Sequence, residues 1–267
     1  KNMNNFLKAT LVASSVIFGS CVLTACTQTT NSMFGDDRSQ LLLVSEETLN
    51  AEAKQAYDEV INQAKANGTL NADENFSKRV DMISKRLIDY APELRADCKN
   101  WNWEVNTIRD NEINAFCLSG GKIGVLTGSI TKINATDDEL AALIGHEIAH
   151  ALRDHGREKV SKKLLTGLGV LAASSAGLGD MVVSGTSLLG DYGVNLPGSR
   201  KLESEADLLG VDIMVRAGYN PQGAISFWNK VVAQEKQGTK IDFLSTHPTS
   251  EKRIVAIQDY INQNYRK

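Results

Sequence analysis

Hydrophobic residues recur at helical spacing in two stretches of the N-terminal half of the chain. The positions are Leu49, Ala53, Tyr57 and Ile61 in the first stretch, and Val80, Ile83, Leu87 and Tyr90 in the second. Residues at such intervals lie on one face of a helix, so each stretch predicts an amphipathic helix packed on a core. The polar sequence NGTLNADEN between them predicts a loop.

The pattern then changes to the two-residue period of strands. From Trp101 to Ile108, hydrophobic residues alternate with polar ones, as in a half-buried strand. Residues 113–118 and 122–127 flank Ser119-Gly120-Gly121, which predicts two strands joined by a tight turn. We therefore expect a small sheet in this part of the chain.

A buried helix is predicted directly after these strands. Thr136 and Glu139 have the spacing of a capping box, in which their side chains bind free amides at a helix start. Apolar residues then cover much of the circumference: Leu140, Leu143, Ile144, Ile148, Ala151 and Leu152. Such a helix is buried on nearly all sides. Further helices are expected at residues 200–216, 221–235 and 250–264, which makes the fold class α+β and mainly helical.

One segment within this domain has a different composition. Residues 164–190 are rich in Gly, Ala and Ser and contain Asp180, which favours a mobile, partly apolar insertion over a membrane span. We place this insertion at residues 165–198 of a domain that runs from 46 to 267.

The chain has 267 residues, is 42% hydrophobic and carries a net charge of −3, so no electrostatic feature predicts a nucleic-acid partner.

The N-terminal residues indicate export. Lys8 precedes an uncharged run of residues 9–23, which is too short to span a bilayer and is typical of a signal peptide at 1–25. Leu-Thr-Ala-Cys at 23–26 resembles the lipobox of bacterial lipoproteins, which implies acylation of Cys26; a plain cleaved signal is the alternative. Thr27 favours the periplasmic face of the outer membrane, with residues 26–45 as a flexible tether. In that compartment Cys98 and Cys117 either form a disulfide or stay as two buried thiols.

The candidate chemistry lies on the buried helix. Two of the four histidines, His146 and His150, are four residues apart in IGHEIAHA, with Glu147 beside the first. Residues four apart are separated by about 40° around a helix, so both imidazoles can bind one ion, while Glu147 lies about 100° from His146. This is the arrangement of a zinc hydrolase, in which a carboxylate serves as the base. Without a metal, a buried helix would leave these polar side chains in need of partners.

A catalytic zinc site requires a third protein ligand. His155 is near in sequence, but on a continuous helix it would lie about 140° from His150, on another face. Glu203 and Asp207 are four residues apart on the predicted helix at 200–216. One of the two carboxylates can therefore reach the metal while the other accepts the free N–H of a ligating imidazole. Alone, such acids would indicate only a solvated helix face.

The chain resembles the gluzincin metallopeptidases of the CAAX prenyl protease and HtpX type, and among them the periplasmic lipoprotein proteases. The matching segments are HEIAH at 146–150, SRKLESEAD at 199–207, NAF at 114–116 followed by GGKIGVLTG, and THP at 246–248 with Arg253. The resemblance implies a zincin-like domain with a small sheet beside the active-site helix. It also implies one Zn²⁺ held by His146, His150 and Glu203, with Glu147 as catalytic base and Asp207 as partner of a ligating histidine.

The same resemblance extends to the substrate. It implies that residues 114–125 form the sheet edge on which a peptide is laid as an added strand, with Asn114, Ala115, Phe116, Gly120 and Gly121 as binding residues. His247 matches a histidine that approaches the metal and blocks or assists it; a helix-start residue before Pro248 is the alternative. Ser119 replaces a proline that many relatives have, a departure that concerns the shape of this edge.

Together these features predict a zinc endopeptidase that acts on polypeptides, by resemblance on misfolded or stalled envelope proteins, and is attached to the membrane through its lipid. A binding protein of the chaperone type, stabilised by zinc, is the alternative from another functional class. A third possibility is a self-inhibited enzyme with His247 on the metal. Glu147 separates the first two, because only the enzyme requires a base.

Overall fold

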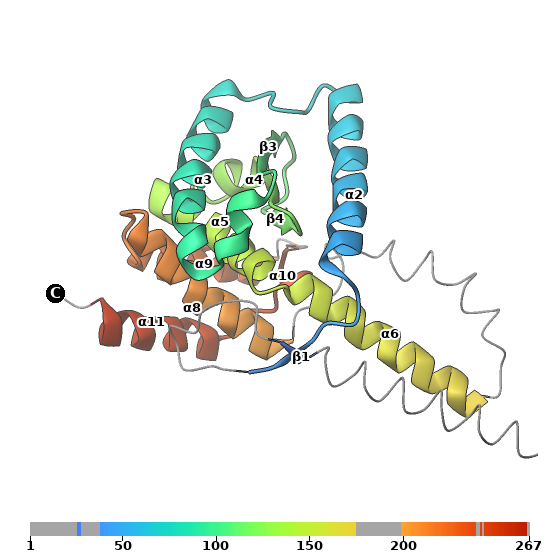
Figure 1. Ribbon diagram of the computed structural model, residues 1–267. Coiled ribbons are helices and arrows are strands. Elements are labelled where there is room, and N and C mark those ends of the chain that lie inside the picture. Colours follow the sequence, from blue (N-terminus) through green and yellow to red (C-terminus); the bar gives the residue numbers. More distant parts are fainter. Residues whose placement is uncertain (1–25, 28–37, 175–198, 239–240, 242, 266–267) are drawn as a thin grey trace, which may run out of the picture.

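The computed structural model describes residues 26–27, 38–174, 199–238, 241 and 243–265 (Figure 1). The predicted signal peptide and most of the predicted insertion at 165–198 lie outside these residues. No helix in the described ranges has the length and hydropathy of a membrane span.

Helices make up most of the described chain. Their bounds are α2 Glu46–Ala66, α3 Glu74–Leu94, α4 Gly128–Thr131, α5 Asp137–Leu152, α6 His155–Ser174, α8 Arg200–Arg216, α9 Gln222–Lys236, α10 Phe243–Thr246 and α11 Glu251–Asn264, with a 3₁₀ helix, η1, at Ala96–Asn100. Each helix predicted from the apolar spacing is present, and α8 has the predicted bounds. The α+β, mainly helical class is confirmed.

The sheet contains β3 Glu104–Ile108, β4 Ala115–Leu118 and β5 Lys122–Leu126, in the order β3-β5-β4. The strand predicted from Trp101 begins only at Glu104, because Trp101 caps η1 and Trp103 donates its indole N–H to the Cys98 carbonyl at 3.0 Å. Strand β5 lies in the centre, parallel to β3 and antiparallel to β4. Residues 114–125 are therefore not one edge, and only β4 among them is an edge strand.

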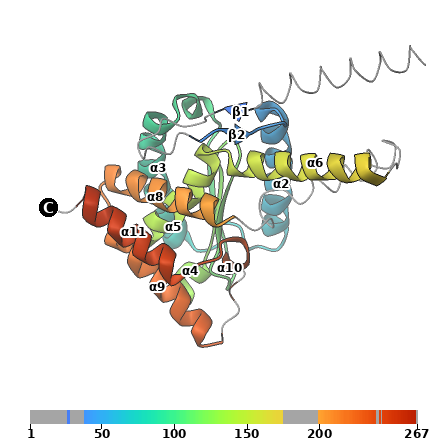
Figure 2. The same cartoon turned by 90° about the horizontal axis from the view of Figure 1, so that it is seen from below.

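Helix α5 lies at the centre of the molecule. It packs against α3, α8, α9 and β4, with the helices α8, α9 and α11 on one side and the sheet and α2 on the other (Figure 2). The backbones of α5 and α8 approach closely, since a Cβ on Gly210 would lie 2.9 Å from the backbone nitrogen of His146. Two facing glycines, Gly145 and Gly210, thus allow the side chains of these two helices to meet.

Helix α5 has well-defined ends. At its start, Thr136 and Glu139 form the predicted capping box. At its end, Asp154 adopts a φ of 51°, a left-handed conformation that breaks the helix before α6 begins at His155. Arg95 binds Asp154 at 3.0 Å and so holds this corner. The helix is therefore not continuous between His150 and His155.

Residues 38–44, which we call the N-terminal strap, are docked on the domain although they belong to the predicted tether at 26–45. Gln40 is 1% exposed and donates to the Arg153 carbonyl, and the Leu43 amide donates to Ser161 Oγ at 2.9 Å. Within the strap, β2 (Gln40–Leu41) pairs with β1 (Cys26–Thr27). The strap differs from a tether because its polar groups find fixed partners on α6 and on the end of α5.

Both cysteines of the predicted domain are buried as free thiols. Cys98 lies in η1 and Cys117 in β4. Of the two possibilities that the sequence leaves open, the structure therefore has the separate thiols. Burial raises the pKa of Cys98 to about 11, so this thiol is protonated at neutral pH.

Candidate metal centre

The two histidines of α5 direct their Nε2 atoms toward the same point. His146 Nε2 and His150 Nε2 are 3.1 Å apart, and both side chains are buried. Their rings meet edge to face, with centroids 4.7 Å apart. This is what four-residue spacing on a helix produces when both side chains turn toward the same neighbour. That neighbour is α8.

Helix α8 brings a carboxylate to the imidazoles. Glu203 Oε2 lies 3.4 Å from His146 Nε2, and Oε1 lies 3.5 Å from His150 Nε2. Glu203 is completely buried, and its Oε1 makes no hydrogen bond to any described residue. A fully buried carboxylate oxygen with no hydrogen bond indicates a missing positive partner.

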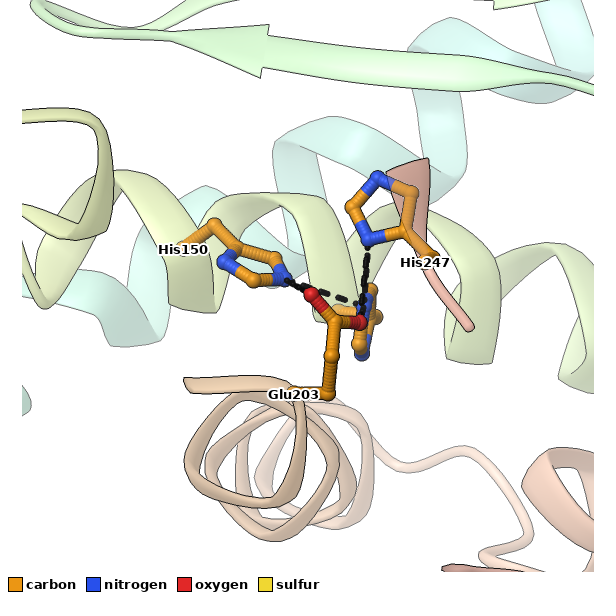
Figure 3. A group of neighbouring side chains, drawn as sticks. His150, Glu203 and His247 are labelled. Atoms are coloured by element: carbon orange, nitrogen blue, oxygen red, sulfur yellow. Dashed lines mark hydrogen bonds and ion pairs between the residues drawn. The ribbon is translucent and has the colours of Figure 1, made fainter. Parts of the chain in front are cut away.

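A third imidazole reaches the same point from the C-terminal part of the chain. His247, which follows α10, places Nδ1 3.1 Å from Glu203 Oε2 and 3.4 Å from His146 Nε2. Figure 3 shows His150 and His247 pointing toward the Glu203 carboxylate from different elements. Donor atoms from His146, His150, Glu203 and His247 all lie within 4.8 Å of one another.

The spacing of these atoms fits a tetrahedral zinc ion. Bonds of about 2.0–2.1 Å to a tetrahedral centre place neighbouring ligand atoms about 3.3 Å apart. Five of the distances between ligand atoms of these four side chains run from 3.1 to 3.5 Å, and all four ligand atoms lie within 4.8 Å of one another. Imidazole and carboxylate donors together suit zinc better than calcium or magnesium, which prefer oxygen alone. The residues present therefore fit the ion.

The charges of the site also suit a cation. Burial raises the pKa of the Glu203 carboxyl, but its close contacts with His146, His150 and His247 outweigh it and hold that pKa far below the ordinary value. Burial lowers the pKa of His150, which keeps this ring neutral and its lone pair available. In the metal-free chain, burial also lowers the pKa of His146, yet the Asp207 and Glu203 carboxylates raise it to about 9.

The other nitrogen of His146 is held by a carboxylate on α8. His146 Nδ1 lies 3.1 Å from Asp207 Oδ1. Asp207 in turn accepts two hydrogen bonds from Arg253 of α11, at 2.7 and 2.8 Å. The Arg253 guanidinium lies over the Trp228 ring, 4.5 Å from its centroid. This arrangement fixes the orientation of the His146 ring and leaves Nε2 directed at Glu203.

Glu147 lies beside this cluster without joining it. Its side chain is 4% exposed, and Oε1 is 3.5 Å from His247 Nε2 with no hydrogen bond to a described residue. Burial raises the pKa of Glu147 above its ordinary value. A carboxylate with a raised pKa is better suited to take and return a proton near neutral pH.

His150 has a support that the sequence reasoning missed. Because α5 ends at Leu152, the chain turns and places His155 Nδ1 2.8 Å from His150 Nδ1. His155 is thus outside the group of candidate metal ligands and lies on the far side of one of them, His150. The polar sequence RDHG, directly after the apolar face of the helix, was the available signal that the helix stops there.

A cleft opens next to Glu147 and His150. It is lined by the edge strand β4, by residues of α2 and α6, and by His247. Asn114, Ala115 and Phe116, which the resemblance assigns to substrate binding, line this cleft. Gly120 and Gly121 do not line it: they form the turn between β4 and β5, where both have positive φ and a Cβ on Gly121 would overlap the Trp103 ring.

Comparison with known proteins identifies the family. The model of peptidase family M48 matches residues 76–261, a range that contains the histidine pair, Glu203, Asp207, His247 and Arg253. The chain belongs to peptidase family M48. As a member of M48 it has the zincin-like peptidase domain that the resemblance implies, and the matched range contains the four residues whose ligand atoms lie close enough to hold one metal ion.

Three M48 relatives show how far the similarity extends. The mitochondrial metalloendopeptidase OMA1 of Schizosaccharomyces pombe is 35% identical over 78% of this chain and 60% of its own length. The OMA1 protein of Saccharomyces cerevisiae is 30% identical over 90% of this chain and 71% of its own length. The metalloprotease LoiP of Escherichia coli is 29% identical over 95% of this chain and 96% of its own length. The chain thus spans less than two thirds of the fission yeast relative.

Proposed function

We propose that this M48 chain is a zinc-dependent endopeptidase. The observation that carries the proposal is the convergence of His146, His150 and Glu203 at one buried position, with Glu147 beside them at the wall of a cleft. Two relatives are named metalloendopeptidases and a third a metalloprotease, which supports the same reaction class. Zinc, when bound, lowers the pKa of a water molecule and polarises the carbonyl of the scissile bond.

The protein's own contribution begins with Glu147. Its Oε1 makes no hydrogen bond to a described residue and is buried, so it can accept a proton from the attacking water and deliver that proton to the leaving amine. The raised pKa of Glu147 brings the free energies of its protonated and ionised forms closer together near neutral pH, so the carboxylate can both take up and release a proton. Asp207 and His155 meanwhile hold the two α5 imidazoles in fixed orientations.

Strand β4 supplies the means to hold a peptide. Among the described strands it pairs only with β5, which leaves its other edge without a strand partner, and its residues line the cleft. An extended substrate can add to that edge through main-chain hydrogen bonds, which are independent of sequence. Phe116 and Leu118 lie in β4 and line the cleft, so apolar side chains of the substrate would find contacts there. This favours unfolded, apolar segments as substrates.

Replacement of Glu147 tests the reaction directly. Glu147→Gln removes the base and keeps the size of the side chain, so we expect one zinc per chain to remain and cleavage of unfolded casein to fall to background. Wild-type protein treated with a chelator should be equally inactive and recover on addition of zinc. Unchanged protection of an aggregating client by Glu147→Gln, together with no cleavage by the wild type, would instead support the chaperone-type alternative.

We also infer that His247 occupies the fourth position of the site. A catalytic zinc site keeps one position open for water, and His247 Nδ1, which is 3.4 Å from His146 Nε2 and 3.1 Å from Glu203 Oε2, would take that position when zinc is bound. His247→Ala should therefore raise the rate of casein cleavage without loss of zinc. A fall in activity at full zinc occupancy would mean that His247 assists the reaction, through its contact with Glu147.

We further propose that the chain acts on misfolded or stalled envelope proteins from the periplasmic face of the bacterial outer membrane, anchored by lipid at Cys26. The proposal rests on the export features of residues 1–26 and on the similarity to LoiP along most of both chains. Cys26→Ala should abolish incorporation of labelled fatty acid and move the protein from the membrane to the soluble fraction. Incorporation that persists in this variant would exclude Cys26 as the lipid site.

A further inference from the structure

The far side of His150 is occupied by a second imidazole rather than by a carboxylate. His155 Nδ1 lies 2.8 Å from His150 Nδ1, and the two rings meet at 74° with centroids 4.9 Å apart. His155 is 1% exposed and comes from the first residue of α6. A contact of this length between two ring nitrogens is a hydrogen bond, so one nitrogen donates and the other accepts.

Glu205 determines which nitrogen donates. Its Oε2 lies 3.1 Å from His155 Nε2, and an ionised carboxylate can only accept. His155 therefore carries its proton on Nε2 and accepts with Nδ1, which requires His150 to donate from its own Nδ1. His150 is then left with a lone pair on Nε2, the atom that faces Glu203 and His146. The contacts thus select the tautomer that can bind a metal.

Glu205 is itself held by the N-terminal strap. Arg38 donates from Nε to Glu205 Oε1 and from Nη2 to Glu205 Oε2, the second bond at 2.9 Å. The same guanidinium binds Glu158 of α6 through Nη1 at 2.9 Å and Nη2 at 2.7 Å. Gln40 of the strap also reaches Glu158, at 3.0 Å. A bidentate guanidinium of this kind fixes the plane of the carboxylate it binds.

We propose that His155, Glu205 and Arg38 form a positioning relay that sets the tautomer and orientation of His150 and so couples zinc retention to docking of the N-terminal strap. The proposal rests on the proposed function, because it takes His150 as a metal ligand. None of the three residues touches the reacting atoms, so they are positioning residues. Arg38 lies outside the range matched by the M48 model, so the strap would support the site from outside the matched domain.

The main experiment measures zinc loss from the purified, zinc-loaded chain into excess 4-(2-pyridylazo)resorcinol. His155→Phe keeps an aromatic ring and removes both hydrogen bonds, and should speed zinc loss by about 10–100-fold, in line with the usual loss of metal affinity when such a partner is removed. His155→Asn places an amide oxygen near the position of Nδ1, and should give a rate between those of His155→Phe and the wild type.

The outer part of the relay is tested by Arg38→Gln. This change leaves His155 and Glu205 in place, so zinc loss should be faster than in the wild type but slower than in His155→Phe. The matched control is Arg79→Gln, which breaks an arginine–carboxylate pair with Asp137, a residue of neither α6 nor the strap. Zinc loss in the control should equal that of the wild type.

Two further readouts separate positioning from general loss of structure. Unfolding of the metal-free proteins in urea shows whether a variant is folded, and a variant that is not folded is excluded. In metal-free wild type, two-bond ¹H–¹⁵N correlation spectra should show the His150 proton on Nδ1, and His155→Phe should show a mixture of tautomers. A change confined to packing would leave the His150 tautomer as in the wild type.

The outcomes are distinct. The relay would be overturned if folded His155→Phe lost zinc at the wild-type rate. It would also be overturned if folded His155→Asn lost zinc as fast as His155→Phe. A wild-type rate in Arg38→Gln would overturn its extension to the strap. A wild-type chain that holds no zinc at all would instead contradict the proposed function, before any variant is compared.

Discussion

The two imidazoles of α5 face the same carboxylate, Glu203, but are supported in different ways. His146 is held by a carboxylate directly, through Asp207, which is fixed by Arg253 at 2.7 and 2.8 Å. His150 is held by a second imidazole, and the carboxylate Glu205 stands one residue further away. On the His146 side the contacts end in the Arg253 guanidinium of α11. On the His150 side they end in Arg38 of the strap, with Arg153 as a further partner of Glu205 at 3.4 Å.

The difference lies in what each support depends on. Asp207 and Arg253 belong to helices of the core, and Arg253 also packs on Trp228 and contacts Glu203 at 3.4 Å. Arg38 belongs to a short segment near the N-terminus in which Leu42 is the one buried apolar side chain, while Val44 is partly buried against Leu49 and Val160. Local opening requires less free energy where fewer apolar contacts are lost. We therefore expect the support of His150, rather than that of His146, to be lost when the N-terminal strap is displaced.

The largest effect should come from the residue that both sides share. Glu203→Gln removes the ionised ligand that faces both imidazoles, so zinc affinity should fall by more than the roughly 10–100-fold cost of losing a supporting partner. Equilibrium competition with a chromophoric chelator measures this. An affinity within tenfold of the wild type would mean that Glu203 is not a ligand, and the comparison of the two supports would lose its basis.

A smaller and asymmetric effect is expected for the two supporting carboxylates. Asp207 contacts the His146 ring directly, whereas Glu205 acts through His155. Asp207→Asn also removes the negative charge that faces the Arg253 guanidinium. This substitution should therefore weaken zinc binding more than Glu205→Gln does. It should also lower the free energy of unfolding by about 2–3 kcal/mol, the usual cost of disrupting a buried charged hydrogen bond. Chelator competition and urea unfolding test both statements. Equal zinc affinities in the two variants would contradict the distinction between direct and relayed support.

The smallest effect concerns acid stability on the strap side. Burial raises the pKa of Glu158, but hydrogen bonds from Arg38, Lys162 and Gln40 outweigh it and lower the pKa from 4.5 to about 2. A carboxyl whose pKa is lower in the folded state contributes stability above pH 4.5 and loses it as the pH falls toward 2. The wild type should therefore exceed Arg38→Gln by on the order of 1 kcal/mol in unfolding free energy above pH 4.5.

That difference should narrow steadily between pH 4.5 and pH 2. Urea unfolding in the presence of chelator measures it without a contribution from metal binding. A difference that stays constant or grows over this interval would show that Arg38 does not stabilise ionised Glu158, and the strap would then have no electrostatic hold on α6.

Much of the fold could be predicted from local sequence. The capping box of Thr136 and Glu139 predicted where α5 begins, and the apolar circumference predicted its burial. Both signals are local, because they depend on spacing within one helix. The order of the strands could not be predicted in this way, since β5 becomes central only by pairing in parallel with β3 across a long connection.

The site shows the same limit at the level of single residues. His146, Glu147 and His150 stand out because their spacing is a known helical pattern. A continuous helix would put His155 about 140° from His150, on another face, whereas Asp154 turns the chain at a φ of 51° and brings the two rings into contact. Arg38 carries no local signal at all: it stands in a polar segment that reads as a tether, and only tertiary contacts with Glu158 and Glu205 reveal its role.

The central claim is that one zinc ion is held jointly by α5 and α8. The most direct measurement is anomalous diffraction at the zinc absorption edge from crystals of the zinc-loaded protein. We predict one strong peak about 2.0–2.2 Å from His146 Nε2, His150 Nε2 and a carboxylate oxygen of Glu203. A zinc-saturated crystal in which no peak lies between these three side chains, or in which the Glu203 carboxylate points away from the ion, would contradict the account.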